Sequence, residues 1–491
     1  MMFDSLIRRS FLKAAAVCGL GAPLAVAGVK VPEGQLTGIS SGSSDAAFRT
    51  PSFASLKSFL DSIPAIDTHD HLHPFDQLPG LVETERGRGV NLYGLWKSSY
   101  LTKIDNLAEW RDAEPFESWW TRAKEDFKNV HATGFYRYMH TSFKDLYGVD
   151  FDRISDSKAK VLDQRIFENY RDERWLFHVI TDRANIELMF IDPFWARFDF
   201  RISYPFQVLV FNVTTLTRGF HASEFDGHPF DDPFVFARTQ GLPPVKSLDD
   251  YLSLLDQMFT IAKKNGAACL KTTAAYERTL QFDDVPKGRA TRVFGHPRSA
   301  LAAADVKEFE DFIMWRLVEL SAKHDLPFQI HTGDARIGGS SPMFLVNLID
   351  ANPRTKFILF HGGFPWVGET GAIVQKYPDR VWIDSVWLPT ISFTLAKRAY
   401  HEWLEVLPSN RIMWGSDDYS AEGIFGETEL TRRCLAEVLA EKVDRGDLPD
   451  WYARQIGKQI LRDNALELFP QLQARIVKEE VGQHQVQRHG P

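Results

Sequence analysis

The sequence contains little cysteine and no long apolar segment. Cys18, Cys269 and Cys434 are its three cysteines in 491 residues, too few for the disulfide framework that holds small secreted proteins together. Beyond the N-terminal leader, no stretch approaches the about 20 apolar residues that a membrane-spanning helix needs. The sequence therefore predicts a globular protein that depends on its apolar core for stability.

A surplus of positive charge is also missing. The formal net charge is −8, with 44% hydrophobic and 25% charged residues, which is ordinary for a globular protein. Proteins that bind nucleic acids or anionic membranes usually carry an excess of positive charge instead. We expect a small-molecule substrate, no nucleic-acid partner and no membrane anchor, and the sequence leaves a homo-oligomer open.

The N-terminus carries a twin arginine. Arg8-Arg9 is followed by Phe11-Leu12-Lys13 and by a weakly apolar run that ends in the small-x-small site Ala25-Val26-Ala27. This pattern resembles the twin-arginine export signal. We expect residues 1–27 to be a signal peptide that sends the protein to the periplasm, and residues 28–50 to be a flexible linker.

Eight apolar runs have the length and composition of buried strands. Between the later runs lie segments with helical spacing, such as the helix that follows the capping box of Ser247 and Asp250. Strands that alternate with helices predict a parallel sheet, and eight units predict an α/β fold of the (β/α)₈ TIM-barrel type, with a doubly wound open sheet as the alternative. The expected strands are 64–70, 186–191, 206–212, 267–272, 327–332, 356–361, 381–385 and 411–417.

Two segments interrupt this rhythm. Residues 74–180 carry many charged and aromatic side chains at helical spacing, and we expect a helical, aromatic insertion at the mouth of the barrel, with a separate helical domain as the alternative. Residues 194–245 are irregular and aromatic apart from one strand. Long irregular loops in a compact domain are usually functional, so we expect them to be lids.

Polar side chains follow the strands at the same end. His69 and His71 close the first strand, and their spacing of two puts both imidazoles on one side. Lys271, His331 and His361 follow later strands, and Asp417 follows the last one. In a barrel these strand ends meet over one mouth, whereas an open sheet would spread them along a line.

This order of residues resembles the amidohydrolase superfamily. The C-terminal run Asp463–Phe469 resembles the Asn-Ala-x-x-Leu-Phe helix of the amidohydrolase-2 branch, and Leu270–Arg278 is similar to a run in the FluG-type amidohydrolase domain. The resemblance implies one metal-dependent barrel over residues 51–470, which leaves residues 471–491 as a polar tail. It also implies that Lys271 is either carboxylated, bridging two metals, or a free amine.

The residue chemistry agrees with that resemblance, because imidazole and carboxylate groups hold divalent transition metals. We expect zinc, as one or two ions, with manganese or iron as alternatives. His69, His71, His331 and Asp417 are the predicted ligands, and Lys271 and His361 are further candidates. Asp417 and His361 are the predicted catalytic groups: Asp417 accepts the proton of a metal-activated water, and His361 polarises the substrate or holds a second metal.

Four side chains are predicted to bind the substrate: Lys271, Tyr276, Arg278 and Trp387. Their cations suit a carboxylate. We expect a hydrolase acting on a C–N (amide or cyclic amide) or C–O (ester or lactone) bond of a small, carboxylate-bearing molecule. A non-oxidative decarboxylase, a uronate-isomerase-like sugar enzyme and a metal-binding or ligand-binding protein without catalysis are the alternatives.

Overall fold

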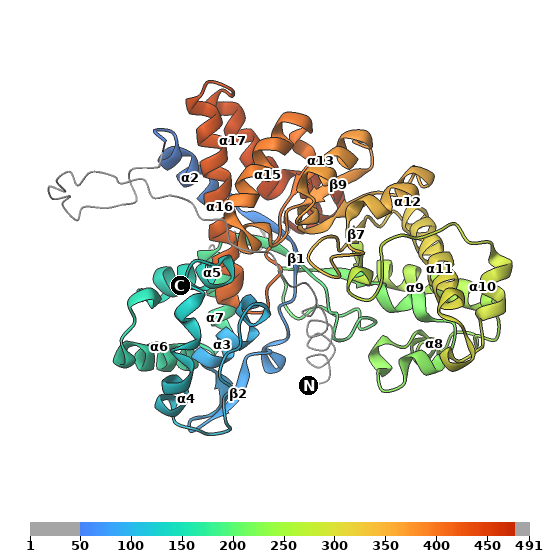
Figure 1. The fold of residues 1–491 in the computed structure, drawn as a ribbon, viewed down its shortest axis with the longest axis horizontal. Helices are drawn as coiled ribbons and strands as arrows, with labels where there is room; N and C mark the ends of the chain where they lie inside the picture. The colour runs from blue at the N-terminus through green and yellow to red at the C-terminus, as the bar shows by residue number, and fades with distance from the viewer. Residues whose placement is uncertain (1–49, 477–491) are drawn as a thin grey trace, which may run out of the picture. The chain divides into compact units, whose positions relative to one another are not determined.

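The computed structural model describes residues 50–476, and the predicted signal peptide, Cys18 and nearly all of the predicted linker lie outside that range. Within it, eight parallel strands form one sheet in the order β1-β4-β5-β6-β7-β8-β9-β10 (Figure 1). The strands are β1 (Ala65–Asp70), β4 (Ile186–Ile191), β5 (Gln207–Asn212), β6 (Cys269–Thr272), β7 (Phe328–Ile330), β8 (Phe357–Leu359), β9 (Val381–Asp384) and β10 (Ile412–Met413).

The two ends of this sheet meet. The backbone N–H of Thr68 donates to the carbonyl oxygen of Trp414 (3.2 Å), that of Asp417 to His69 (2.9 Å), and that of His71 to Asp418 (3.0 Å). These bonds join β1 to the residues that follow β10 and close the barrel. The (β/α)₈ prediction is therefore confirmed, and an open sheet is excluded for this part of the chain.

The strands read as apolar runs because a barrel buries both faces of its sheet. Every residue of β1 and β5 is buried, and Ile66, Leu188 and Val210 are completely covered. Cys269 lies among them as a free thiol, and burial raises its pKa. Cys434, also free, is buried under the outer helices.

Helices cover the outside of the barrel. α9 begins at the predicted capping box, in which Ser247 and Asp250 bond to each other's backbone N–H groups. The segment 450–468, read as one helix, is divided by a π-helical turn at Gln459–Asp463. The main covering helices are α2 (Phe53–Asp61), α8 (Pro233–Thr239), α9 (Leu248–Lys264), α10 (Lys287–Val293), α11 (Ala303–His324), α12 (Val346–Ala351), α13 (Val367–Lys376), α14 (Leu388–Ile391), α15 (Phe393–Val406), α16 (Ala421–Asp444), α17 (Asp450–Lys458) and α18 (Asn464–Leu468).

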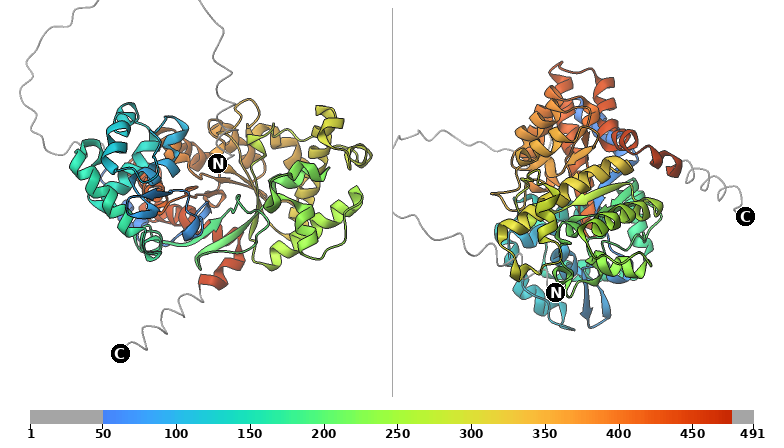
Figure 2. Two further views of the ribbon diagram at one scale, coloured as in Figure 1. Left: turned by 90° about the horizontal axis from the view of Figure 1, so that it is seen from below. Right: turned by 90° about the vertical axis from the view of Figure 1, so that its right-hand side faces the viewer.

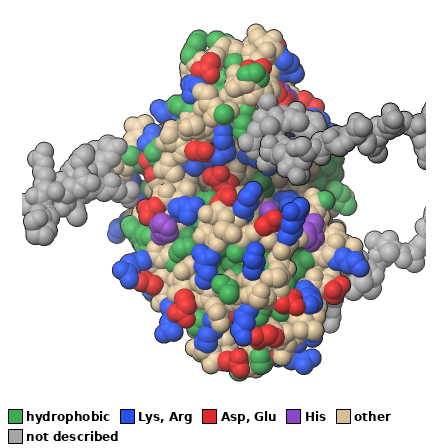
Figure 3. All heavy atoms as spheres, turned by 90° about the vertical axis from the view of Figure 1, so that its left-hand side faces the viewer, with side chains coloured by type: hydrophobic (Ala, Val, Ile, Leu, Met, Phe, Trp, Pro, Cys, Tyr) green, Lys and Arg blue, Asp and Glu red, His purple; other side chains and the backbone are tan. Residues whose placement is uncertain are grey.

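The insertion lies between β1 and β4, on the opposite side of the sheet from α8–α11 (Figures 1 and 2). Its helices are α3 (Leu92–Ser98), α4 (Phe116–Ala123), α5 (Gly134–Tyr147), α6 (Asp156–Asn169) and α7 (Arg174–Phe177). It also contains an antiparallel hairpin, β2 (Leu81–Thr84) and β3 (Gly87–Val90), which the prediction of a helical insertion missed. Cationic and anionic side chains alternate over its outer face (Figure 3).

Close packing makes the insertion part of the barrel unit. A Cβ on Gly426 of α16 would lie 2.3 Å from the Tyr138 carbonyl oxygen of α5, and one on Gly134 would lie 1.9 Å from the Thr390 carbonyl oxygen. At this contact the buried carboxylate of Glu422 accepts hydrogen bonds from the hydroxyls of Tyr147 and Tyr170 and from the indole N–H of Trp175. A separate helical domain does not fit these contacts.

The C-terminal part of the described chain also packs on the barrel. After α18 the chain continues through a short helical turn, with Leu472 and Ile476 buried beside Leu188 and Phe190. The packed chain thus extends past residue 470, where we expected the polar tail to begin. In the described range, no helix combines the length and apolarity needed to cross a membrane.

Candidate metal centre

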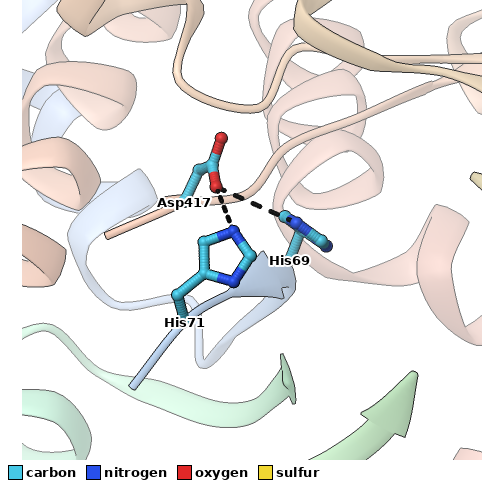
Figure 4. Close-up of side chains that lie close together, drawn as sticks. All are labelled: His69, His71 and Asp417. Atoms are coloured by element: carbon cyan, nitrogen blue, oxygen red, sulfur yellow. Dashed lines mark ion pairs between the residues drawn. The ribbon is translucent and has the colours of Figure 1, made fainter. Parts of the chain in front are cut away.

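Three predicted ligands converge at the mouth of the barrel. Asp417 Oδ1 lies 3.0 Å from His71 Nε2 and 3.8 Å from His69 Nε2. One ligand atom from each residue falls within 4.8 Å of the others. The three side chains point at one another (Figure 4), and all are buried. Two imidazole nitrogens and a carboxylate oxygen are a donor set suited to zinc, manganese or iron.

Barrel closure brings Asp417 to the two histidines. Its N–H donates to the His69 carbonyl oxygen across the closing strands, and its φ of 60° turns the residue away from extended strand geometry. Ser416 anchors the turn, since its N–H and hydroxyl both donate to the Asp67 carboxylate. A Cβ on Gly415 would lie 2.9 Å from the His69 nitrogen, so Gly-Ser-Asp fits this close approach.

The His71–Asp417 contact calls for a cation. His71 Nδ1 lies 3.1 Å from the Asp192 carbonyl oxygen, which can only accept, so Nδ1 carries a proton and Nε2 faces Asp417 Oδ1. Two unprotonated atoms 3.0 Å apart would repel each other, so a proton or a metal ion must lie between them. Burial lowers the pKa of His71, but the hydrogen bond and charge of Asp417 outweigh it and raise the pKa overall. The residues therefore fit a divalent cation.

Lys271 lies directly under this group. Its Nζ is 3.3 Å from His69 Nε2 and 3.5 Å from the centre of the Phe360 ring. Burial lowers the pKa of Lys271 to about 8, against the opposing charges of Asp417, Asp192 and Asp384. Burial, and then the charge of Lys271, lower the pKa of His69 well below its usual value. His69 is therefore a neutral imidazole, the form that binds metals.

The other two predicted histidines form a neighbouring pair. His361 Nε2 lies 3.0 Å from His331 Nδ1, and His361 Nδ1 lies 3.1 Å from the Val386 carbonyl oxygen and 3.9 Å from Asp417 Oδ2. His361 therefore touches the group of three through Asp417, whereas His331 is linked to it through His361. Burial lowers the pKa of His361 to about 4 despite the charge of Asp417.

Buried carboxylates support the mouth from below. Asp67, Asp384 and Asp418 are fully buried, and burial raises the pKa of each to about 7. Each accepts hydrogen bonds that fix a strand end; for example, Asp384 Oδ2 accepts from the Thr68 hydroxyl at 2.5 Å. At neutral pH this layer is only partly ionised, which limits the negative charge beneath the ligands.

Aromatic side chains surround the mouth. The Trp387 ring lies 5.7 Å from that of His361, and the Tyr276 ring 4.4 Å from that of His331. Tyr100, from the insertion, packs on Trp387 at 4.3 Å and donates its hydroxyl proton to the Asp417 carbonyl oxygen. The insertion therefore contacts Asp417, one of the predicted ligands, directly. Tyr276 is 46% exposed, so it marks the solvent side of the group.

Arg278 is the predicted site residue that the structure does not bring to the cluster. Its guanidinium binds Glu310 at 2.9 Å and Asp311, both on α11. These two carboxylates already compensate its charge, which leaves little to offer a substrate. The expectation that Arg278 and Tyr276 act together on a carboxylate therefore does not fit the contacts of Arg278.

Sequence reasoning missed four residues of the mouth. Asp192 directly follows β4 and Asp384 is the last residue of β9, so the strand-end rule that found Lys271 would have found them as well. Tyr100 and Lys103 come from the short helix Tyr100–Lys103 of the insertion. No local pattern distinguishes those two from other aromatic and basic residues in that segment.

The model of one protein family, described as amidohydrolase, matches residues 219–471, just over half of the chain. The chain belongs to the amidohydrolase family. The match contains Lys271, His331, His361 and Asp417, whereas His69 and His71 precede it. Protein fluG of Emericella nidulans is 30% identical to this amidohydrolase over 149 residues, which cover 29% of this chain and 17% of that protein. The chain thus corresponds to a small part of that relative's length.

Solved structures match most of the chain at low identity. A uronate isomerase from Thermotoga maritima (TM-score 0.66, 14% identity) covers 88% of this chain and 100% of its own. A glucuronate isomerase from Caulobacter crescentus (0.65, 15%) covers 88% and 97%. A candidate metal-dependent hydrolase from Lactobacillus casei (0.58, 15%) covers 85% and 98%. At this identity they establish a shared fold.

Proposed function

We propose that this amidohydrolase is a metal-dependent hydrolase that cleaves a C–N or C–O bond of a small, carboxylate-bearing substrate. The observation that carries the proposal is the contact between His71 Nε2 and Asp417 Oδ1 at 3.0 Å, beside His69. A buried imidazole and carboxylate that face each other in this way need a proton or a metal ion between them, and the neighbouring neutral imidazole of His69 favours the metal ion. Family membership adds that such a cation serves catalysis.

His69, His71 and Asp417 would hold the ion, and zinc suits them best because zinc favours nitrogen with a single carboxylate oxygen. When bound, such an ion activates a water molecule and polarises the bond to be cleaved. Because only these three ligands meet at one point, we infer that the site holds one ion. A carboxylated lysine would be needed only to bridge two ions, so Lys271 would remain a free amine. His331 and His361 would be ligands only if a second ion were bound.

The chain's own residues would supply the proton transfers. Asp417 keeps Oδ2 toward His361 while Oδ1 faces the histidines, so it can accept a proton from water and pass it to the leaving group. His361 donates through Nδ1 to a backbone carbonyl, which fixes its ring and leaves Nε2, 3.0 Å from His331 Nδ1, as a hydrogen-bond acceptor. Burial lowers the pKa of Lys271 to about 8 before any ion binds, and Lys271 would supply an amine next to His69.

A uronate isomerase is the second candidate function. The two isomerase structures align with nearly their whole lengths and with 88% of this chain, so the likeness includes the large segment between β1 and β4. An isomerase would use the same ligands and two proton-transfer groups without consuming water. The periplasmic location, predicted from the leader, remains part of this proposal.

The test combines elemental analysis with a substrate panel. Metal-loaded protein should contain about one zinc per chain and hydrolyse at least one member of a panel of N-acyl amino acids, cyclic amides and lactones. Interconversion of D-glucuronate with its keto sugar, without hydrolysis of the panel, would establish the isomerase instead. Release of carbon dioxide from aromatic acids would establish a decarboxylase. Absence of bound metal after loading would refute all three.

A further inference from the structure

One lysine of the insertion reaches the mouth of the barrel. Lys103, the last residue of the short helix Tyr100–Lys103, places Nζ 2.6 Å from Asp334 Oδ2 in the loop after β7. The same Nζ lies 4.1 Å over the Trp387 ring, after β9. Lys103 and Asp334 keep about a third of their side-chain surface exposed, 34% and 32%. This ammonium group is thus held beside the mouth and stays accessible to solvent.

Both partners of Lys103 adjoin the histidine pair. The backbone oxygen of Asp334 lies 3.4 Å from His331 Nε2, and the Trp387 ring packs against His361. The cation therefore stands on the rim of the group formed by His331, His361 and Asp417. A substrate whose reacting bond lay at that group would bring its other end near Lys103.

Neither cation predicted from the sequence can take this position. Lys271 is 1% exposed and lies under His69 and Phe360, so a substrate anion would reach it only through the ligands. Arg278 is bound to two carboxylates of α11. Lys103 has one carboxylate partner, which is itself one-third exposed and can turn toward water.

Trp387, whose ring lies beneath the Lys103 ammonium group, has an unsatisfied donor. Its indole N–H is buried and has no acceptor among residues 50–476, and its φ of 61° is a conformation that few non-glycine residues adopt. A bound oxygen acceptor that reached this N–H would satisfy it.

We propose that Lys103 is a specificity-determining residue that binds the carboxylate of the substrate, which replaces Asp334 on the ammonium group. This inference rests on the proposed function for the location of the reacting bond. In the free protein, Asp334 holds Lys103 in place. In the complex, the substrate carboxylate takes over that charge pairing, and the Trp387 ring stays beneath the cation.

The experiment uses matched ligand pairs that differ only in charge. Binding to the metal-loaded protein is measured by calorimetry for D-glucuronate, benzoate and N-acetylglycine, each against its carboxamide. The wild type should bind at least one acid more tightly than its amide. Lys103→Gln should weaken binding of that acid about 10-fold, as expected for one charge-assisted hydrogen bond, and should change binding of the amide less than about 2-fold.

Asp334→Asn separates this role from a structural one. If Asp334 competes with the substrate, its removal should tighten acid binding several-fold, the opposite of the effect of Lys103→Gln. If the ion pair only holds the insertion in place, both variants should weaken acids and amides alike, which would overturn the proposal. Lys97→Gln, which breaks a comparable ion pair with Glu109 on the insertion (2.8 Å), is the control and should change neither.

Equal binding of every acid and its amide by the wild type would also overturn the proposal. Because these measurements need no turnover, their result is independent of whether the panel reveals hydrolysis or isomerisation. If the protein prefers acids to amides but hydrolyses no member of the panel, the proposed reaction is refuted and the proposed role of Lys103 stands. If it hydrolyses a substrate but shows no preference for acids, the proposed reaction stands and the role of Lys103 is refuted.

Discussion

Two groups of histidine and aspartate in the described range come close enough to share a cation, and they differ in what surrounds them. At the barrel mouth, His69, His71 and Asp417 are buried and set by strand ends. On the insertion, His140 lies 3.1 Å from Asp150 and 3.5 Å from Asp152, both of which are exposed. Asp152 already binds Arg137 at 2.8 Å.

We infer from this difference that ligand types in proximity are not sufficient to predict a metal site. The insertion group has its cation in Arg137, and its carboxylates face water. Among residues 50–476, no arginine or lysine forms an ion pair with Asp417, and the backbone fixes the geometry of the barrel group. We therefore expect the insertion group to contribute to stability and the barrel group to bind a metal. The following variants test this difference, from the largest expected effect to the smallest.

The largest effect is expected for Asp417→Asn. Loss of the proton acceptor should lower the turnover of whichever substrate the panel identifies by about 10³-fold, within the 10²–10⁴-fold usual for general acid–base catalysis. The matched control, Asp150→Asn, should leave turnover unchanged. Metal content measured on the same samples should fall for His71→Ala and stay constant for His140→Ala. Equal metal loss in both histidine variants would contradict the assignment of metal binding to the barrel group alone.

Glu422→Leu tests the contact between the insertion and the barrel. The substitution leaves the hydroxyls of Tyr147 and Tyr170 and the indole N–H of Trp175 without their acceptor. At about 1–3 kcal/mol for each buried donor, we expect the free energy of unfolding to fall by about 3–5 kcal/mol in urea titrations. Glu422→Gln, which keeps one acceptor oxygen, should lose less. A loss below about 1 kcal/mol for Glu422→Leu would show that the insertion does not depend on this carboxylate.

Gly426→Ala adds one methyl group at the same contact. The new Cβ would meet the Tyr138 carbonyl oxygen at 2.3 Å and Ser142 Oγ at 2.7 Å, so we expect a loss of about 1–3 kcal/mol from overpacking. Gly288→Ala is the control, because a Cβ there has no neighbour among the described atoms within 4 Å and its position in α10 favours alanine by up to about 1 kcal/mol. We expect Gly426→Ala to lower the melting temperature and Gly288→Ala to raise it. Equal changes in both variants would contradict the close packing at Gly426.

The smallest effect is expected for Asp152→Asn. Burial alone would raise the pKa of Asp152, but hydrogen bonds from Arg137 and Tyr136 outweigh burial and lower the pKa to about 2. A lowered pKa stabilises the fold above the unfolded value near 4, and the contribution disappears as the pH falls through 2. Since the side chain is 29% exposed, we expect about 1 kcal/mol at pH 7. The difference between variant and wild type should shrink between pH 4 and pH 3, and a constant difference would contradict this account.

The sequence was most informative where function and strand geometry coincide. His69 and Lys271 lie in the last two residues of their strands, His71 directly follows β1, and Asp417 follows β10 by four residues. Parallel strands that end at one face bring such residues together whatever the loops do. Side chains that depend on how loops fold could not be placed in this way. Arg278 follows β6 closely but turns to α11, while Lys103, far from any barrel strand in sequence, reaches the mouth because α5 and α16 hold the insertion there.

The insertion also shows which local signals were weak. The hairpin of β2 and β3 is four residues per strand and sits at the surface of the insertion, with Val82 and Leu81 only partly buried. It therefore lacks the clear alternation that marks a half-buried strand. The barrel strands, buried on both faces, gave continuous apolar runs and were all located to within a few residues.

The closing hydrogen bonds of the barrel have one further consequence. His69 lies in the first strand, His71 directly follows it, and Asp417 follows the last strand. Any ion shared by the three would therefore link the first strand of the barrel to the last. Loss of the metal should then weaken the hydrogen bonds between β1 and the residues after β10 before the others. The amide protons of Thr68, His71 and Asp417 should exchange with solvent before those between the other strands. In such a protein, binding of the metal and closure of the barrel would be coupled.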